Sequence, residues 1–388
     1  MKKILLVGGG SGGHITPVLA VADEIKKISP KTELVYVIAK GDKLISMPEE
    51  CGSVDKVRTI RAGKFRRYHG EGLKQLLDIR TIEKNIRDMF YVFVGFFQSL
   101  SLIRSEKPEV IFIKGGFVGM PIGLAATILR VPYITHDSDA VPGLANRIIS
   151  KGAALHTVAM PTNVYNYESR KTVQVGVPVS KSYKFVSEST MQAARKKLEL
   201  PIGKSIVLVT GGGLGAVRLN TAVTKIAKQL TEKNSVHIVH LVGPGNSEKV
   251  IEQYSAQKVD PQSVTVLDFA PDLYNYSAAS DIIVTRAGAT TLTEFAIQAK
   301  PCIVIPNANL TGGHQSKNAS VLAKLAAIEL VEDREVVNNP EVLQTTILDL
   351  LNDKKRQQEL SDNINKTVIR DSAKKIATIL CDSGLGKK

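Results

Sequence analysis

One sequence pattern occurs twice in this chain and constrains its fold more than any other feature. Near the start, the apolar run Ile4–Val7 leads into the glycine-rich stretch GGGSGGH, and a segment of helical character follows. In the second half, Ile206–Val209 leads into GGGLGA in the same way. A short buried strand, a glycine turn and a helix together form the first unit of a doubly wound α/β domain. The repetition therefore predicts two such domains.

Both halves continue with short apolar runs separated by segments of helical length. Near-continuous apolar strands that alternate with helices are typical of parallel sheets covered on both faces. The predicted strands are Ile4–Val7, Leu34–Ile38, Val110–Ile113, Tyr133–Thr135 and Val173–Val175 in the first half, and Ile206–Val209, Val236–Leu241, Val264–Val266, Asp281–Val284 and Cys302–Ile305 in the second.

The domain boundary is expected near Val175–Ser182, where Pro178 and small residues interrupt the pattern. We therefore expect an N-terminal domain over residues 1–180, a C-terminal domain over 181–365, and a helix over 366–388 that returns to the N-terminal domain. A chain of 388 residues is long enough for two cores.

The two glycine turns are candidate anion sites. Gly8–Gly13 fits GxGxxG and Gly211–Ala216 fits GxGxxA. Glycines let a phosphate approach the backbone, and the following helix offers N–H groups and a partial positive charge. The alternative is a tight turn with no ligand. A dinucleotide cofactor is disfavoured, because the second strand of the first half ends in Lys40 and not in the carboxylate that would hold a ribose.

The formal charge of +14 predicts an acidic partner. Basic residues gather in the segment from Lys56 to Arg87, and the uncharged, aromatic stretch Met89–Ile103 follows. That stretch is shorter than the roughly 18–20 apolar residues of a spanning helix, so we expect a helix lying on an anionic membrane through Lys56–Ile103. The alternative is a buried helix beside a solvated basic face. Nucleic acid is disfavoured, because Phe65 and Tyr68 are the only aromatic residues within the basic run.

Polar side chains follow several predicted strands and are candidates for chemistry. His14 comes at the start of the first helix, where the helix dipole disfavours its charged form and leaves a neutral imidazole that can accept a proton. A second polar group, at the end of a strand of the first half, consists of His136, Asp137 and Asp139. Its carboxylates are candidates for bases, for ligands of sugar hydroxyls, or for simple caps of the next helix.

In the second half, Glu294 lies three residues after Thr291. This spacing fits either a capping box or a helix start that binds a diphosphate and a ribose. Gln315 and Asn318 follow the next strand. The three scattered cysteines form no metal motif, and neither a cofactor nor a metal is expected.

The clusters occur in a fixed order over almost the whole chain, and in that order they resemble the MurG family of bacterial glycosyltransferases. The matching stretches are GGGSGGHITPVLAVA, GLA within MPIGLAAT, HDSDAVPGLANR, GGGLGA, FAPDL, RAGATTLTE and HQSKNA. The resemblance implies the GT-B fold, in which two Rossmann-like domains face a cleft. It also implies an inverting transfer of GlcNAc from UDP-GlcNAc to undecaprenyl-diphosphate-MurNAc-pentapeptide, in peptidoglycan precursor synthesis at the cytoplasmic face of the cell membrane. Another UDP-sugar enzyme of the same fold, such as a UDP-GlcNAc epimerase or a glycolipid synthase, is the alternative.

The resemblance also implies roles for individual residues. His14 is expected to be the catalytic base, with Asp137 as the second choice. The acceptor diphosphate is expected at Gly10, Ser11, Gly12, Gly13 and His14. The donor UDP-GlcNAc is expected to contact Ser11, Gly12, Gly13, Asp139, Ser180, Gly213, Ala270, Arg286, Gly288, Ala289, Thr290, Thr291, Glu294, Gln315 and Asn318, with Glu294 on the ribose.

Three positions depart from the family pattern. Asp139 replaces an asparagine, Ser180 replaces an arginine that would face a phosphate, and Gly213 replaces a serine. The charge-assisted contact between such an arginine and a phosphate is worth about 1–3 kcal/mol. Lys181 and Arg218 are candidates for supplying the missing cation.

Overall fold

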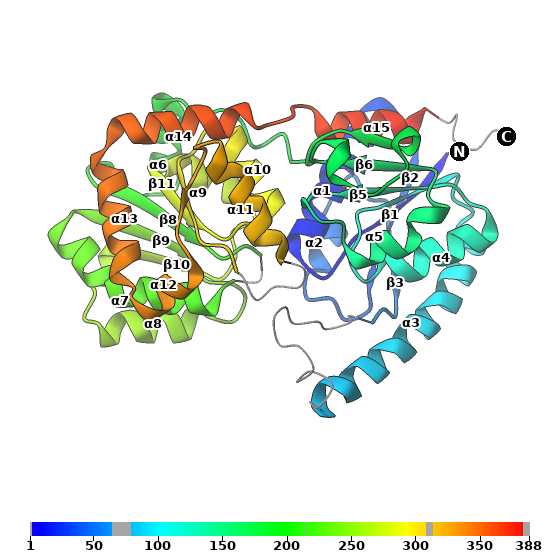
Figure 1. Cartoon of the computed structure of the whole chain (residues 1–388), viewed down its shortest axis with the longest axis horizontal. Helices are drawn as coiled ribbons and strands as arrows, with labels where there is room; N and C mark the ends of the chain where they lie inside the picture. The colour runs from blue at the N-terminus through cyan, green and yellow to red at the C-terminus, as the bar shows by residue number, and fades with distance from the viewer. Residues whose placement is uncertain (1, 64–78, 214, 308–312, 383–388) are drawn as a thin grey trace. The chain divides into compact units, whose positions relative to one another are not determined.

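The computed structural model describes residues 2–63, 79–213, 215–307 and 313–382, with only the backbone described over 79–86. These residues form two compact units (Figure 1). Unit 1 takes the chain up to Ser180 and from Ile369 onward. Unit 2 takes residues 181–368, apart from a short segment that ends at His314. Each unit is built on a parallel sheet, which confirms the predicted fold class.

The sheet of unit 1 has seven parallel strands in the order β3-β2-β1-β4-β5-β6-β7. The strands are β1 (Lys3–Val7), β2 (Glu33–Ala39), β3 (Lys56–Ile60), β4 (Val110–Ile113), β5 (Tyr133–Asp137), β6 (Leu155–Val158) and β7 (Thr172–Gln174). The helices are α1 (Gly12–Ile28), α2 (Ser46–Glu49), α3 (Ile79–Glu106), α4 (Gly119–Leu129), α5 (Leu144–Ile149) and α15 (Ser372–Cys381).

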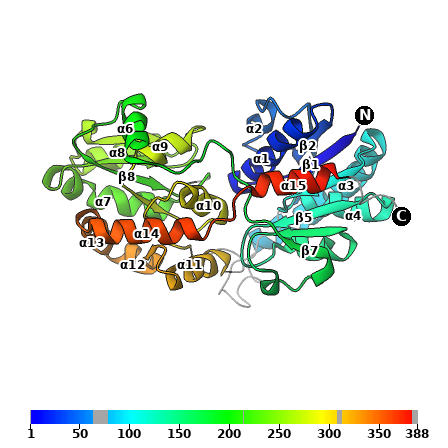
Figure 2. The same cartoon turned by 90° about the horizontal axis from the view of Figure 1, so that it is seen from above.

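The apolar run in β1 reflects burial on both faces of this sheet. Ile4 and Leu6 lie in a core with residues of α1 and α15, whereas Leu5 and Val7 lie in a second core with residues of α4. Successive side chains of a strand point to opposite faces, so a strand covered on both sides is apolar throughout. Helix α15, near the C-terminal end, packs against α1 near the N-terminal end (Figure 2).

The sheet of unit 2 has six parallel strands in the order β10-β9-β8-β11-β12-β13. The strands are β8 (Ser205–Thr210), β9 (Val236–Leu241), β10 (Val264–Leu267), β11 (Ile282–Thr285), β12 (Cys302–Val304) and β13 (Glu329–Leu330). The helices are α6 (Glu188–Lys197), α7 (Val217–Lys233), α8 (Ser247–Ala256), α9 (Leu273–Ala279), α10 (Ala289–Ile297), α11 (His314–Lys324), α12 (Asp333–Asn338), α13 (Glu341–Asn352) and α14 (Lys354–Lys366).

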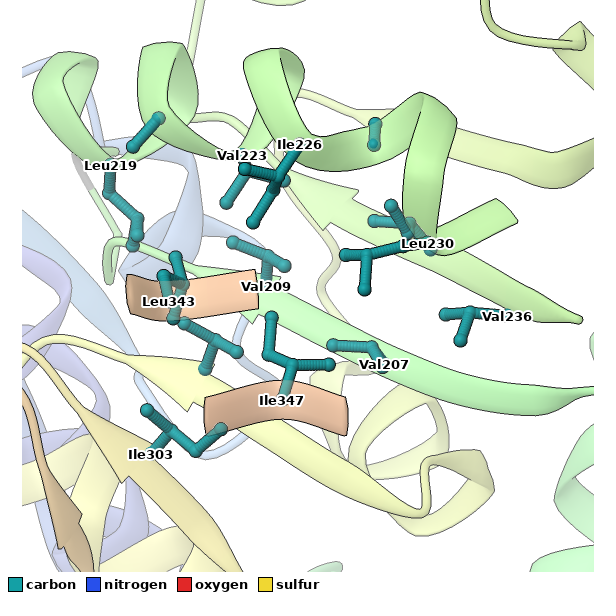
Figure 3. Packing of buried hydrophobic residues seen from close by; sticks show 14 of the residues in the cluster. Val207, Val209, Leu219, Val223, Ile226, Leu230, Val236, Ile303, Leu343 and Ile347 are labelled. Carbon is teal, nitrogen blue, oxygen red and sulfur yellow. The ribbon is translucent and has the colours of Figure 1, made fainter. Parts of the chain in front are cut away.

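The second apolar run, in β8, has the same explanation as the first. Val207 and Val209 pack against α7 and α13, and Ile206 and Leu208 belong to the core on the opposite face. Figure 3 shows how α7 and α13 direct apolar side chains at this strand: Leu219, Val223, Ile226 and Leu230 from α7, and Leu343 and Ile347 from α13.

Two strands of unit 1 were not predicted. β3 lies at the sheet edge and carries mostly exposed side chains, so it lacks an apolar signature. It also lies in the basic segment that was assigned to membrane contact. Lys56 forms an ion pair with Glu33 at 2.7 Å, and Arg58 forms one with Glu106 at 2.9 Å. These two cations are therefore ion-paired within unit 1, where Lys3 shares both carboxylates. β6 was also missed; it is only four residues long and two of them are polar.

Candidate active site

The carboxyl ends of β1 and β4 form the point in unit 1 where the strand order changes direction. In open α/β sheets, ligands bind at such a point. The first glycine stretch follows β1 there and leads into α1. A Cβ atom at Gly8 would overlap the carbonyl oxygen of His14, so only glycine allows the chain to turn this tightly into the helix. The N–H of Gly10 donates to Asp42 at 2.6 Å, which ties the turn to the segment after β2.

His14 lies in the first turn of α1, where the sequence predicted it, and its side chain is half-buried. The turn after β4 packs beside its ring: a Cβ atom at Gly116 would lie 3.6 Å from His14 Cδ2. Ser11, Gly12 and Gly13 lie with it at the helix start. A histidine in this place faces the strand-order switch point of the sheet.

Asp137, the second candidate base, is the last residue of β5 and only 5% of its surface is exposed. Its Oδ1 accepts hydrogen bonds from Asn146 Nδ2 at 3.0 Å and from the N–H of Gly143 at 3.2 Å, and its Oδ2 accepts from the hydroxyl of Tyr167 at 2.8 Å. Burial raises the pKa of Asp137, and these donors oppose that shift. The geometry fits a carboxylate that holds the loop between β5 and α5.

The neighbours of Asp137 are also held in place. His136 is fully buried between the hydroxyls of Thr157 and Ser138, each at 3.1 Å, and burial lowers the pKa of its imidazole well below the usual range. The carbonyl oxygen of Asp139 accepts a hydrogen bond from Tyr165 at 3.0 Å. His136 is therefore a neutral structural histidine, and Asp139 follows it in an anchored loop.

In unit 2 the strand order changes direction between β8 and β11. The second glycine stretch follows β8 and leads into α7. Gly215 has a φ of +73°, and a Cβ atom there would overlap the carbonyl oxygen of Val242, so this turn also requires glycine. Gly213 lies in the same turn and is half-buried.

Arg286, a predicted donor ligand, is buried directly after β11. Its Nη1 donates to Asp333 Oδ1 at 2.6 Å and to the carbonyl oxygen of Ile305 at 3.0 Å. Arg218, a candidate for the missing cation, reaches the other oxygen of Asp333 at 3.1 Å. Both arginines thus contribute to one ion-pair cluster that joins β11, α12 and the start of α7.

Glu294 is the sixth of the nine residues of α10, which begins at Ala289 after Gly288. The capping-box alternative is wrong, because Glu294 is the sixth residue of the helix and no side chain caps its start. Only 7% of Glu294 is exposed, and its carboxyl group hydrogen-bonds the hydroxyl of Tyr183. Burial raises the pKa of Glu294 to about 8, and the hydrogen bond with Tyr183 acts against this rise.

The loops around α10 are linked to α11. Asn318 is buried, and its Nδ2 donates to the carbonyl oxygen of Ala287 at 3.1 Å. Gln315 Oε1 accepts from the N–H of Asn307 at 2.8 Å. Ala270 is buried in the core that also contains Ala287. Asn318 thus links α11 to the loop before α10, and Gln315 links α11 to the segment after β12. Thr290 and Thr291 lie within the first turn of α10.

The predicted donor residues are divided between the units. Gly213, Ala270, Arg286 and the residues of α10 and α11 belong to unit 2, whereas the helix start Ser11–Gly13, Asp139 and Ser180 belong to unit 1. Sequence reasoning missed Asp42, Tyr183 and Lys114, which the structure places at these loops. A lysine directly before two glycines at the end of an apolar strand was the available signal for Lys114.

Comparisons with known proteins match two domains of one family to the two halves of the chain. The N-terminal domain of glycosyltransferase family 28 matches residues 4–156, and the C-terminal domain of that family matches residues 206–376. Two relatives named UDP-N-acetylglucosamine–N-acetylmuramyl-(pentapeptide) pyrophosphoryl-undecaprenol N-acetylglucosamine transferase are similar over nearly the full length. The one from Caldicellulosiruptor saccharolyticus is 30% identical, with 94% of this chain and 93% of the relative covered. The one from Clostridium perfringens is 31% identical, with 92% of each covered.

Solved structures show the same fold. The crystal structure of MurG from Acinetobacter baumannii matches with a TM-score of 0.68 at 22% identity, covering 98% of this chain and 99% of that one. A UDP-GlcNAc 2-epimerase from Methanocaldococcus jannaschii matches with a TM-score of 0.61 at 15% identity, covering 98% and 99%. Within the described ranges, no helix has the length and apolar character to cross a bilayer. Both domains, their order and the identity to these relatives lead to one conclusion: the chain belongs to glycosyltransferase family 28 and, within it, to the MurG family of N-acetylglucosaminyltransferases.

Proposed function

We propose that this protein moves GlcNAc from UDP-GlcNAc to the hydroxyl of a muramyl-pentapeptide carried on undecaprenyl diphosphate. The observation that carries the proposal is the identity of 30–31% to transferases named for this reaction, over 92–94% of the chain. The structure supports the proposal, because each sheet has a glycine turn and a helix start at its switch point. One such turn would bind the diphosphate of the donor and the other the diphosphate of the acceptor.

The donor is assigned to unit 2. Glu294 would accept hydrogen bonds from both ribose hydroxyls, and Ala289–Thr291 at the start of α10 would contact the phosphates through their N–H groups. Gln315 and Asn318 on the next helix would contact the sugar, and Ala270 would lie beside the uracil ring. The hydrogen bonds of Asn318 and Gln315 to the loops before α10 and α11 support a rigid site.

The reaction is proposed to invert the sugar. His14 takes the proton of the acceptor hydroxyl, whose oxygen attacks the anomeric carbon from the face opposite UDP. The bond between that carbon and the β-phosphate oxygen breaks, and UDP leaves with the electron pair. N–H groups at the turn containing Gly213 and at the start of α10 stabilise the negative charge of the leaving diphosphate as preorganised dipoles. Asp137, whose two oxygens already accept three hydrogen bonds, would position the neighbouring loop.

A peripheral position on the membrane is proposed through α3. One side of α3 is buried at Gly95, Ser99 and Ile103, and the helix packs against α4. The other side exposes an apolar stripe, which we define as Met89, Phe90, Phe93 and Phe97. Such spacing places all four on one face of a helix. A stripe of this kind is typical of helices that lie in the membrane interface.

Two arginines lie beside Tyr91 of the same helix. The guanidinium groups of Arg61 and Arg87 each lie 5.7 Å from the centre of the Tyr91 ring. Arginines near an anionic surface contribute about 1 kcal/mol each. The rest of the predicted basic segment, residues 64–78 and the side chains of 79–86, lies outside the described residues. The proposed contact therefore rests on the stripe and on Arg61, since Lys56, Arg58 and Arg87 are already in ion pairs.

One assay tests the function. Release of UDP from UDP-GlcNAc is measured with and without a polyprenyl-diphosphate-muramyl-pentapeptide in detergent. We expect release that depends on the acceptor and a disaccharide product with inverted configuration. Incubation with the donor alone is the control, because a UDP-GlcNAc epimerase would produce a sugar isomer without an acceptor. Isomer formation with no acceptor dependence would overturn the proposal.

A further inference from the structure

Lys114 is a buried cation whose side chain donates no hydrogen bond to the described residues. It directly follows β4, and only 3% of its surface is exposed. Its backbone N–H donates to the carbonyl oxygen of Val7 at 3.0 Å, which fixes its backbone next to the end of β1. Among the residues that the structure describes, no hydrogen bond and no ion pair within 4.0 Å satisfies its ammonium group.

The strand pattern shows which way the side chain of Lys114 points. Phe112, two residues earlier, lies in the core on the α1 side of the sheet, so Lys114 projects toward the same side. On the neighbouring strand, His136 follows the same alternation after Ile134 and contacts Phe112, with the ring centres 6.4 Å apart. The turn that begins at Lys114 reaches the ring of His14 through Gly116. Lys114 thus lies at the switch point, on the side where α1 starts.

The charges around Lys114 leave it incompletely compensated. Burial lowers the pKa of its ammonium, and the charges of Asp139 and Asp137 act in the opposite direction. The oxygens of Asp137 are occupied by Asn146, Gly143 and Tyr167 rather than by Lys114. An ammonium on a side chain with so little exposure loses part of its hydration, and that loss costs free energy when no hydrogen bond replaces it. Such a group is stabilised when an anion enters the site.

We propose that Lys114 binds the diphosphate of the lipid-linked acceptor, together with the N–H groups at the start of α1. Its ammonium supplies the compact positive charge, and the helix start supplies directed donors. The ligand class is an organic diphosphate ester. This inference rests on the proposed function, because that function places the acceptor in unit 1. The donor diphosphate is the other possible source of the same chemistry, and the test separates the two.

The test uses the full-length protein with Lys114→Met, which keeps the length and apolar stem of the side chain and removes the charge. Binding of inorganic pyrophosphate is measured by calorimetry in the presence of saturating UDP, and binding of UDP is measured alone. We expect pyrophosphate affinity and the KM of the acceptor to worsen about 10- to 100-fold, as for loss of one charge-assisted contact. UDP affinity should stay unchanged. Lys114→Arg should recover part of the loss, and Lys151→Met, at an exposed site of unit 1, is the matched control.

Thermal unfolding distinguishes binding from a structural role. Removing a poorly hydrated ammonium that no described residue hydrogen-bonds should leave the melting temperature unchanged or raise it. A large fall in melting temperature with unchanged pyrophosphate affinity would overturn the inference and make Lys114 a counter-ion of Asp139. Lys114→Gln provides the same reading should the methionine variant fail to fold. Weakened UDP binding would also overturn it. If the unsubstituted protein transfers no sugar while pyrophosphate binding still depends on Lys114, the proposed function fails, and diphosphate binding by Lys114 stands without its assignment to an acceptor.

Discussion

At the scale of single residues, Glu294 and His14 are the two side chains on which the proposed chemistry depends. Glu294 is buried, and with a pKa of about 8 its carboxyl group is largely protonated at neutral pH. A protonated carboxyl group accepts hydrogen bonds less well than a carboxylate. The two hydroxyls of a ribose would both donate hydrogen bonds to this group. Donor binding should therefore favour ionisation of Glu294 and release a proton.

The first prediction concerns Glu294→Gln and its pH dependence. The folded pKa of about 8 lies above the ordinary 4.5, so the folded state holds a proton that the unfolded state releases. Stability contributed by this group is thus present below pH 4.5 and is lost as pH rises toward 8. The variant should gain stability relative to the unsubstituted protein by on the order of a few kcal/mol on going from pH 5 to pH 8. Thermal melts at both pH values measure this.

The same substitution tests the ribose contact. An amide offers one acceptor oxygen where a carboxylate offers two, so UDP affinity should fall about tenfold or more at pH 8. Isothermal titration with UDP measures this, and Glu232→Gln, at an exposed position of α7, is the matched control. Equal UDP affinity in the variant and the unsubstituted protein would remove Glu294 from the donor site.

The second prediction concerns His14→Ala. Loss of a general base lowers the rate about 10²- to 10⁴-fold. We expect kcat to fall by this factor while UDP affinity is retained, because the donor is assigned to unit 2. Steady-state turnover and UDP titration on the same preparation give both numbers. Undiminished kcat would show that another group takes the proton.

At the scale of secondary-structure elements, α3 separates a buried face from an exposed apolar stripe. The third prediction is that Phe93→Ser combined with Phe97→Ser reduces co-sedimentation with vesicles of anionic phospholipid. A phenyl side chain that leaves water fully gains about 1.5–3 kcal/mol, so binding should weaken at least about tenfold. UDP affinity should not change.

The matched control for the stripe is Ile202→Ser. Ile202 is 63% exposed and Phe93 is 61% exposed, but Ile202 lies in a turn of unit 2. Its substitution should leave vesicle binding as it is. Equal losses in both variants would mean that general surface hydrophobicity, and not α3, governs the membrane contact.

The elements also show what a sequence can and cannot predict. The apolar runs of β1, β4 and β8 were found because strands buried on both faces are largely apolar. β3 was missed because an edge strand with exposed side chains reads as a polar segment. Site residues next to glycines, such as His14, could be placed from spacing alone. The position of Lys114 before two glycines gave a similar signal, but its burial could not be predicted, because burial depends on packing between strands that are distant in sequence.

At the scale of the whole molecule, neither unit is one continuous stretch of chain. The chain leaves unit 1 after Ser180 and returns to it at Ile369. Helix α15 then completes the core beside α1 with Ile376, Ala377 and Leu380, all of which are buried. Substitutions near the C-terminal end should therefore act on the unit that contains His14.

The fourth prediction is that Ile376→Ala destabilises unit 1 selectively. Truncation of a buried isoleucine to alanine costs about 2–5 kcal/mol. In urea, the unfolding transition of unit 1, followed by loss of pyrophosphate binding, should move to lower concentration. The transition followed by UDP binding should stay in place. Lys375→Ala, at the exposed neighbouring position, is the control. A common shift of both transitions would show that the units unfold together.

The return of α15 to α1 has a consequence for synthesis on the ribosome. Residues 3–180 emerge first, but their apolar face beside α1 stays open until residues 372–381 have also emerged. All of unit 2 is translated in between and can close its own cores earlier. Unit 1 is thus the first to begin translation and the last to complete its core. Until α15 emerges, unit 1 exposes an apolar face of the kind that chaperones bind.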